Sequence, residues 1–122
     1  MTQKRILILE DEIVIQRLCE RLLAKTGHEL LFARTLKTAF EAIEKKDLDL
    51  FISDLKLPDG NGVEAIRRFK EKYPNKRVII MTGSLSPENR MRAIEDLNIS
   101  LFLYKPFDNI DFEATVQIGL AG

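Results

Sequence analysis

The sequence predicts an α/β fold in which helices cover both faces of a five-stranded parallel sheet. Five short apolar runs alternate with longer amphipathic stretches along the 122 residues, in the order βαβαβαβαβα. Several runs are apolar at every position instead of alternating, which is typical of parallel strands buried under helices on both sides. Connections between such strands are right-handed crossovers, so the helices divide between the two faces.

Five segments have the length and composition of strands. Each is a short apolar run, and most are rich in β-branched or aromatic residues. The second is preceded by the polar pair His28-Glu29, which suits a strand at the edge of the sheet. The predicted strands are 6–9, 30–32, 50–52, 78–81 and 101–104.

The stretches between these strands carry apolar residues at helical spacing. Asn61, with Glu64 three residues later, is expected to cap the third helix. Ser86-Pro87-Glu88 opens the fourth with a cap, a proline at the first helical position and an acid. A fifth helix with weak apolar spacing is expected from about Asn109 to the end. The predicted buried stripes of the first four helices are Ile15, Leu18, Cys19, Leu22 and Leu23; Leu36, Ala39, Phe40 and Ile43; Val63, Ile66 and Phe69; and Met91, Ile94 and Leu97.

Five strands with helices on both faces suggest a three-layer, flavodoxin-like (βα)5 sandwich with the strand order 2-1-3-4-5. The length fits a single domain over residues 1–122, and the sequence contains no internal repeat, low-complexity segment or linker. In this architecture, ligands bind at the carboxyl ends of the strands, near the switch point between strands 1 and 3.

Composition argues against several classes of function. The 19 Lys and Arg residues balance 19 Asp and Glu residues, so no global positive field favours binding to nucleic acid or to anionic lipid. The single cysteine, Cys19, lies at core spacing and is expected to be a buried, inert thiol. The apolar run at 6–9 is too short for a signal-peptide core, and no later segment could span a membrane, so a cytoplasmic location is expected.

Polar residues with complementary chemistry follow four of the five predicted strands. Strands 1 and 3 are predicted neighbours, so the carboxylates of Glu10, Asp11 and Asp54 should converge. They would repel one another without a cation, and a hard oxygen site with room for water suits Mg²⁺. Thr82 and Lys105 follow strands 4 and 5. Each residue alone could be a helix cap or loop residue, but their joint placement favours a phosphoryl-transfer site.

At these residues the chain resembles the receiver domains of two-component response regulators. The resemblance covers essentially the whole chain. The matching residues have the order, the spacing and the positions on strands and loops that the family shows. The matching residues are Glu10-Asp11, Asp54, Leu57-Pro58-Asp59-Gly60-Asn61-Gly62, Thr82-Gly83 and Lys105-Pro106-Phe107.

The resemblance implies that Asp54 accepts a phosphoryl group from a phosphohistidine of a sensor histidine kinase or phosphotransferase domain. It implies that Glu10 and Asp11, directly or through water, hold Mg²⁺ together with Asp54 and the backbone carbonyl of Lys56. The protein would then act as a switch and not as a multiple-turnover enzyme on a metabolite.

The resemblance also implies how the switch would work. Thr82, Gly83 and Lys105 would bind the phosphoryl oxygens, and Lys105–Pro106 would be a cis peptide bond. Phe102 occupies the family's aromatic switch position, where it would respond to Thr82 by packing alone. The surface of helix 4, strand 5 and helix 5 would then change its affinity for a partner.

Several properties stay open at this point. Lys56 and Ser84 occupy positions that often tune the lifetime of the phosphorylated state, but the sign of their effect does not follow from the sequence. The receiver uses up the chain, so no output domain is expected within it, and the apolar end at 118–122 favours a truncated longer protein. The cognate kinase, the output partner and the presence of a homodimer are not recoverable.

Three other functions compete with this interpretation. A haloacid-dehalogenase-like phosphatase would carry an Asp-x-Asp motif after strand 1, where this chain has Glu10-Asp11-Glu12. A flavodoxin-like FMN carrier would need a hydroxyl- and glycine-rich phosphate loop at the same place. A receiver-like module that binds partners without phosphorylation would not need the complete set of site residues.

Overall fold

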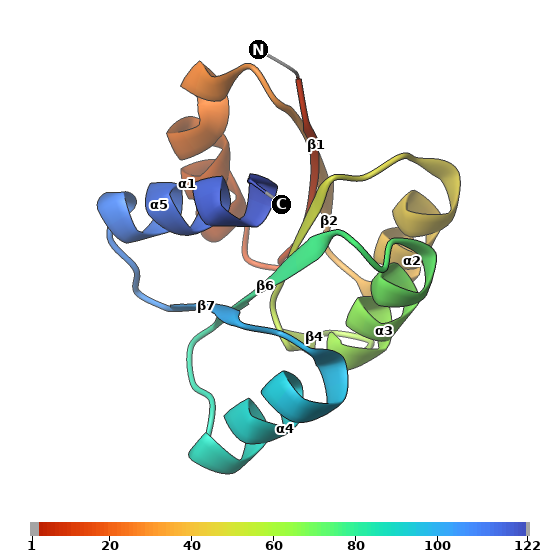
Figure 1. Cartoon of the computed structure of the whole chain (residues 1–122). Coiled ribbons are helices and arrows are strands. Elements are labelled where there is room, and N and C mark those ends of the chain that lie inside the picture. The colour runs from red at the N-terminus through yellow and green to blue at the C-terminus, as the bar shows by residue number, and fades with distance from the viewer. Residues whose placement is uncertain (1–2, 122) are drawn as a thin grey trace.

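A single sheet of five parallel strands organises the computed structural model, which describes residues 3–121 (Figure 1). The spatial order β2-β1-β3-β6-β7 is the predicted order 2-1-3-4-5, with β2 at an edge as expected. An unpredicted antiparallel ribbon, β4 (Lys56–Leu57) with β5 (Gly60–Asn61), follows β3. The five strands of the main sheet are β1 (Arg5–Leu9), β2 (Glu29–Ala33), β3 (Leu50–Ser53), β6 (Arg77–Thr82) and β7 (Leu101–Tyr104).

Helices cover both faces of this sheet. One face packs against α1 and α5, and the other packs against α2, α3 and α4 (Figure 1). The fifth helix ends at Leu120, while Gly122, which the prediction included, lies outside the described residues. The helices are α1 (Ile13–Leu23), α2 (Leu36–Lys45), α3 (Val63–Lys72), α4 (Pro87–Leu97) and α5 (Asn109–Leu120), and a 3₁₀ turn, η1 (Ala24–Thr26), follows α1.

Two apolar clusters, one on each face of the sheet, hold these layers together. Phe51 of β3 packs with Phe69 of α3 on one face, with ring centroids 5.3 Å apart. Ile52, the next residue of β3, packs on the opposite face with Met81 and Phe112. All these side chains are fully buried. Burial of each such side chain contributes about 1.5–3 kcal/mol, so β3 is fixed from both sides and Asp54 follows a rigid strand.

The start of α3 differs from the sequence prediction by one residue. Gly62, not Asn61, is the N-cap, and the Asn61 carboxamide oxygen accepts a hydrogen bond from the backbone N–H of Val63 at 2.9 Å. A Cβ atom at position 62 would lie 2.1 Å from the backbone carbonyl oxygen of Asp54. Only glycine therefore fits where the chain passes this close to the end of β3.

The predicted buried face of α4 is wrong for two of its three residues. Met91 and Ile94 are 52% and 39% exposed, whereas Ala93 is buried and Leu97 is half-buried. Instead, α4 packs against the core through Ala93 and Leu97, which are four residues apart. Both residues also line a groove of about 450 Å³ between α3 and α4. The predicted cap is confirmed, because the Ser86 hydroxyl oxygen accepts the N–H of Asn89 at 3.1 Å.

The single cysteine and the single histidine have structural roles. Cys19 is fully buried, and burial raises the pKa of its thiol to about 12, which confirms the prediction of an inert thiol. His28 Nδ1 accepts a hydrogen bond from the backbone N–H of Lys4 at 3.0 Å, beside the edge strand β2. Within residues 3–121, every helix is too short or too polar to cross a membrane.

Candidate functional site

A cleft of about 270 Å³ opens where the carboxyl ends of β1, β3, β6 and β7 meet. Parallel strands end at the same edge of a sheet, and this places the residues that follow them side by side. Most of the predicted site residues lie here, but Glu10 and Phe102 are not part of the wall. The cleft is lined by Asp11, Glu12, Asp54, Lys56, Thr82, Gly83, Ser84 and Lys105.

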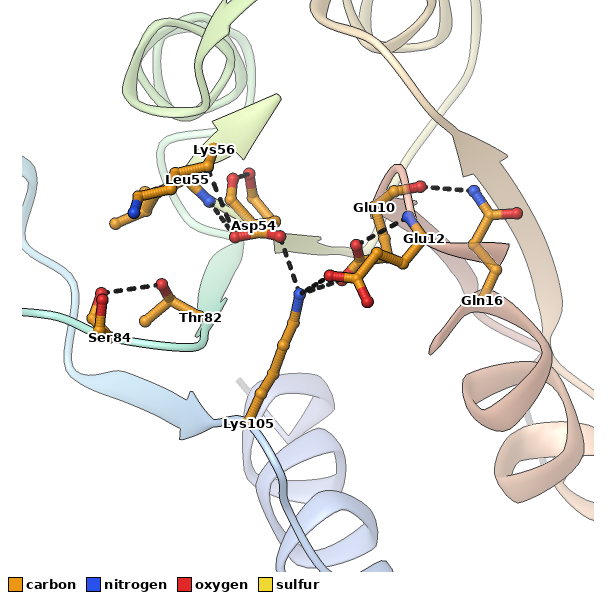
Figure 2. Close-up of polar contacts among 10 residues, drawn as sticks. Glu10, Glu12, Gln16, Asp54, Leu55, Lys56, Thr82, Ser84 and Lys105 are labelled. Carbon is orange, nitrogen blue, oxygen red and sulfur yellow. Dashed lines mark hydrogen bonds and ion pairs between the residues drawn. The ribbon is translucent and has the colours of Figure 1, made fainter. Parts of the chain in front are cut away.

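Lys105 joins the acidic residues from two strands. Its ammonium nitrogen lies 2.8 Å from Asp54 Oδ2 and 2.5 Å from Glu10 Oε1 (Figure 2). Its side chain is 12% exposed, and burial by itself would lower the pKa of the ammonium group. The contacts with Asp54 and Glu10 outweigh burial and raise this pKa, so Lys105 stays charged. The peptide bond that follows, Lys105–Pro106, is cis, as predicted.

Glu10 is fully buried at the end of β1. Its Oε2 accepts the backbone N–H of Glu12 at 3.0 Å, and its backbone carbonyl accepts a hydrogen bond from Gln16 Nε2 at 2.6 Å. Oε1 is in an ion pair with Lys105, but it is the one buried side-chain oxygen or nitrogen without a hydrogen bond in the described chain. Burial raises the pKa of Glu10, and Lys105 opposes that shift. Glu10 is therefore fully buried beside the Lys105 ammonium group and is not part of the cleft wall.

Asp54 is held in one orientation by bonds to both of its carboxylate oxygens. Oδ1 accepts the backbone N–H groups of Leu55 at 2.7 Å and of Lys56 at 3.4 Å, while Oδ2 faces Lys105 (Figure 2). The side chain is nearly enclosed, since Asp54 is only 6% exposed. These contacts fix the orientation of the Asp54 carboxylate on the wall of the cleft.

The ribbon after Asp54 is anchored to α2 by Asp59, for which the sequence predicted no role of its own. The carboxylate of Asp59 accepts the backbone N–H groups of Leu36 at 2.8 Å and Lys37 at 3.2 Å. The bond from Leu36 is the main reason that the pKa of Asp59 is lowered. These bonds occupy free N–H groups at the start of α2 and tie down the loop that carries Lys56.

The two predicted switch residues lie on neighbouring strands. The Thr82 hydroxyl donates to the backbone carbonyl of Ser84 at 3.1 Å, so it points along its own loop and not toward Asp54 (Figure 2). Phe102 is half-buried and stacks on Tyr104, with ring centroids 6.5 Å apart. The Arg90 guanidinium lies 5.2 Å from the centroid of the Phe102 ring. An inward movement of Thr82 would require its bond to Ser84 to break.

Two residues of the site were not assigned a role from the sequence. Glu12 lines the cleft, and oxygens of Glu10, Asp11 and Glu12 lie within 4.8 Å of one another. Arg34, at the end of β2, donates to the backbone carbonyl of Asp11 at 3.2 Å. Glu12 could have been recognised as a third acid in the same loop. Arg34 could not, because its contact depends on the register of β2 against β1.

Known proteins resemble the sequence of this chain over most of its length. Residues 6–117 match the model of the response regulator receiver domain family. Sporulation initiation phosphotransferase F of Bacillus subtilis (strain 168) is 32% identical over 110 residues, which are 88% of this chain and 86% of that protein. The transcriptional regulatory protein CrdR of Helicobacter pylori is 27% identical over 115 residues, and the chain spans about half of that protein, 54% of its length.

Solved structures resemble the chain over nearly its full length. A CheY-like response regulator receiver domain protein from Methanospirillum hungatei JF-1 has a TM-score of 0.90 and 28% identity, covering 98% of this chain and 95% of that one. The receiver domain of the sensor histidine kinase PA1611 from Pseudomonas aeruginosa PAO1 has a TM-score of 0.84 and 21% identity, covering 99% and 100%. The PA1611 structure has a magnesium ion coordinated in its active site cleft.

Proposed function

We propose, from the premise that this chain belongs to the family of response regulator receiver domains, that Asp54 accepts a phosphoryl group from a phosphohistidine of a partner protein. The observation that carries the proposal is the pairing of Asp54 with Lys105 at 2.8 Å on the wall of an open cleft. A nucleophilic carboxylate and a fixed cation beside it are two of the groups that phosphoryl acceptance uses.

The transfer itself is a displacement at phosphorus. A carboxylate oxygen of Asp54 attacks, the P–N bond to the donor imidazole breaks, and a P–O bond forms. The aspartyl phosphate carries about two negative charges at neutral pH, in place of the one on the free carboxylate, and Lys105 is placed to offset them. The backbone N–H of Leu55 holds the other carboxylate oxygen during the attack, so little reorganisation is needed.

The residues of the cleft fit Mg²⁺ by the chemistry of their donors. Its lining contains carboxylates and no histidine or cysteine, a set that suits a hard cation. Asp11, Asp54 and the backbone carbonyl of Lys56 would hold the ion. Glu10, which the sequence predicts as a ligand directly or through water, does not line the cleft and would act through water. When bound, Mg²⁺ would supply positive charge that offsets charge on the transferring oxygens.

Replacing Asp11 with asparagine is expected to weaken Mg²⁺ binding by about tenfold or more, because it removes a charged oxygen ligand. Isothermal titration calorimetry with MgCl₂ measures this affinity directly. Glu20→Gln, an exposed acid on α1, is the matched control for the loss of one negative charge. Equal affinities for the Asp11 variant and the wild type would exclude Asp11 as a ligand.

The phosphorylated state would act as a switch and not as a multiple-turnover enzyme. Thr82 would exchange its bond to Ser84 for one to the phosphoryl group, and Phe102 would repack with it. The surface of α4, β7 and α5 would then present a different face to an output domain, a protein target or a second copy. We place this reaction in the cytoplasm, in a single domain that spans residues 1–122.

The test is the intact mass of the protein after incubation with acetyl phosphate and Mg²⁺. One added phosphoryl group is expected in the wild type, and none in Asp54→Asn or in a sample without metal. If the wild type gains no adduct, and beryllofluoride with Mg²⁺ also leaves the NMR signals of Thr82 and Phe102 unchanged, the phosphorylation-independent binding module becomes the better explanation.

A further inference from the structure

A small polar pocket lies at the end of the sheet opposite Asp54. It has a volume of about 240 Å³ and is lined by residues that join α3 to β6 and α4 to β7. Figure 1 shows these two connections. Val78 and Leu101 contribute its apolar surface. Asn98, in the left-handed conformation with φ 56°, turns the chain out of α4 and brings Ser100 to the same pocket. The pocket is separate from the acidic cleft, since the two share no residue.

The charged residues of this pocket are all cations. Lys70, Lys76 and Arg77 line it, and no acidic residue does. Lys76 is neutralised by Asp49, 3.2 Å away. Lys70 and Arg77, in contrast, have no acidic partner within 4.0 Å among residues 3–121. The positive charges of Lys70 and Arg77 therefore lie in one pocket without a carboxylate to balance them.

Lys70 shows most clearly that the pocket is electrostatically unbalanced. Lys70 is half-buried, and its ammonium group makes one long contact, 3.5 Å, to the backbone carbonyl of Lys76. Burial, and next the charge of Arg77, lower the pKa of Lys70, and no carboxylate acts in the opposite direction. An anion bound between Lys70 and Arg77 would offset the cost of burying the Lys70 charge and the repulsion between the two cations.

We propose that this pocket binds a phosphate dianion, either free or as a small monoester, between Lys70 and Arg77. The planar guanidinium of Arg77 can donate two parallel hydrogen bonds to one phosphate, and Lys70 adds a second charge. The side chains of Asn98 and Ser100 make no hydrogen bond to another described residue and can donate at the rim. The site would give this domain a phosphate response that is independent of Asp54.

The affinity is expected to be modest. The carboxyl ends of α3 and α4 point toward the pocket, and the partial negative charge of a helix end weakens anion binding there. Arg77, Asn98 and Ser100 are also exposed, so water competes with each contact. We therefore expect a dissociation constant on the order of 1 mM for inorganic phosphate.

The test is a titration of the metal-free wild-type chain with inorganic phosphate in the presence of a chelator, followed by ¹H–¹⁵N NMR. Saturable shifts are expected at the amides of the lining residues, and not with sodium chloride at equal ionic strength. Arg77→Ala should weaken binding by about tenfold or more. Arg21→Ala, an exposed arginine on α1 that lies outside the pocket, removes the same charge and should leave the affinity unchanged.

A parallel titration with glycerol 2-phosphate separates the two sources of the ligand. Tighter binding of the ester would assign the site to phosphate monoesters, and equal or weaker binding would assign it to free phosphate. The proposal is overturned if the shifts do not saturate, if chloride reproduces them, or if the Arg21 and Arg77 variants weaken binding equally.

Discussion

Replacing Lys105 with methionine is expected to slow phosphorylation of Asp54 by about 10²-fold, because the ammonium group that pairs with the acceptor carboxylate is lost. The same change should lower the free energy of unfolding at neutral pH by roughly 3 kcal/mol, since it leaves the buried carboxylate of Glu10 without its ion-pair partner. Methionine keeps most of the buried aliphatic stem, so lost packing contributes little.

The loss of stability in this variant should depend on pH in a defined direction. Burial already raises the pKa of Glu10, and removal of Lys105 would raise it further. Below the ordinary glutamate pKa, both the folded and the unfolded state carry the proton, and the raised pKa costs nothing. As the pH rises, the unfolded state ionises first and stability falls. The difference between the variant and the wild type should therefore be larger at about pH 8 than at about pH 5.

Urea denaturation followed by circular dichroism at the two pH values gives the stability, and the rate of mass gain with acetyl phosphate gives the activity. Lys25→Met is the matched control, because Lys25 is an exposed lysine paired with Glu113 at 3.5 Å. It should change neither quantity appreciably. A Lys105 variant that is phosphorylated at the wild-type rate would contradict the role assigned to this residue.

Replacing Gly62 with alanine is expected to destabilise the fold by about 3 kcal/mol or more, which is large for the addition of one methyl group. The new Cβ atom would lie 2.1 Å from the backbone carbonyl oxygen of Asp54 and 2.9 Å from Ser53 Oγ. Ser53 is the last residue of β3 and Asp54 follows it directly, and this strand is packed from both sides and cannot move freely. Relief of the clash would displace Asp54, so phosphorylation should also fall.

The stability of this variant is measured by urea denaturation against Gly83→Ala. Gly83 is the matched control, because a Cβ atom there would meet no atom within 4 Å and its φ is not positive. Its unfolding free energy should stay within about 0.5 kcal/mol of the wild type. If Gly62→Ala is equally mild, the close approach of α3 to β3 is not as rigid as described.

The fold was predicted well from patterns among residues that are close together in the sequence. The five apolar runs gave the strands, and the switch-point rule brought Asp54 and Lys105 to one cleft. The buried face of α4 was assigned wrongly because Met91 and Ile94 are apolar yet exposed, and spacing cannot tell which of two overlapping stripes meets the sheet.

The details of the site depended on contacts that spacing does not encode. The sequence placed Glu10 in the cleft, but its longer side chain is buried beside Lys105 and makes no part of the wall. The anchoring of the ribbon by Asp59 needs two N–H groups from a helix that begins 23 residues earlier. Such contacts follow from tertiary packing, which a single sequence does not specify.

The central claim is that the phosphoryl group is carried by Asp54 and by no other carboxylate of the cleft. Borohydride reduces an aspartyl phosphate to homoserine, so treatment of the phosphorylated protein followed by peptide sequencing in the mass spectrometer reads the acceptor directly. We expect homoserine at position 54, with Asp11 unchanged. A reduced residue at position 11, or at any position other than 54, would contradict the account.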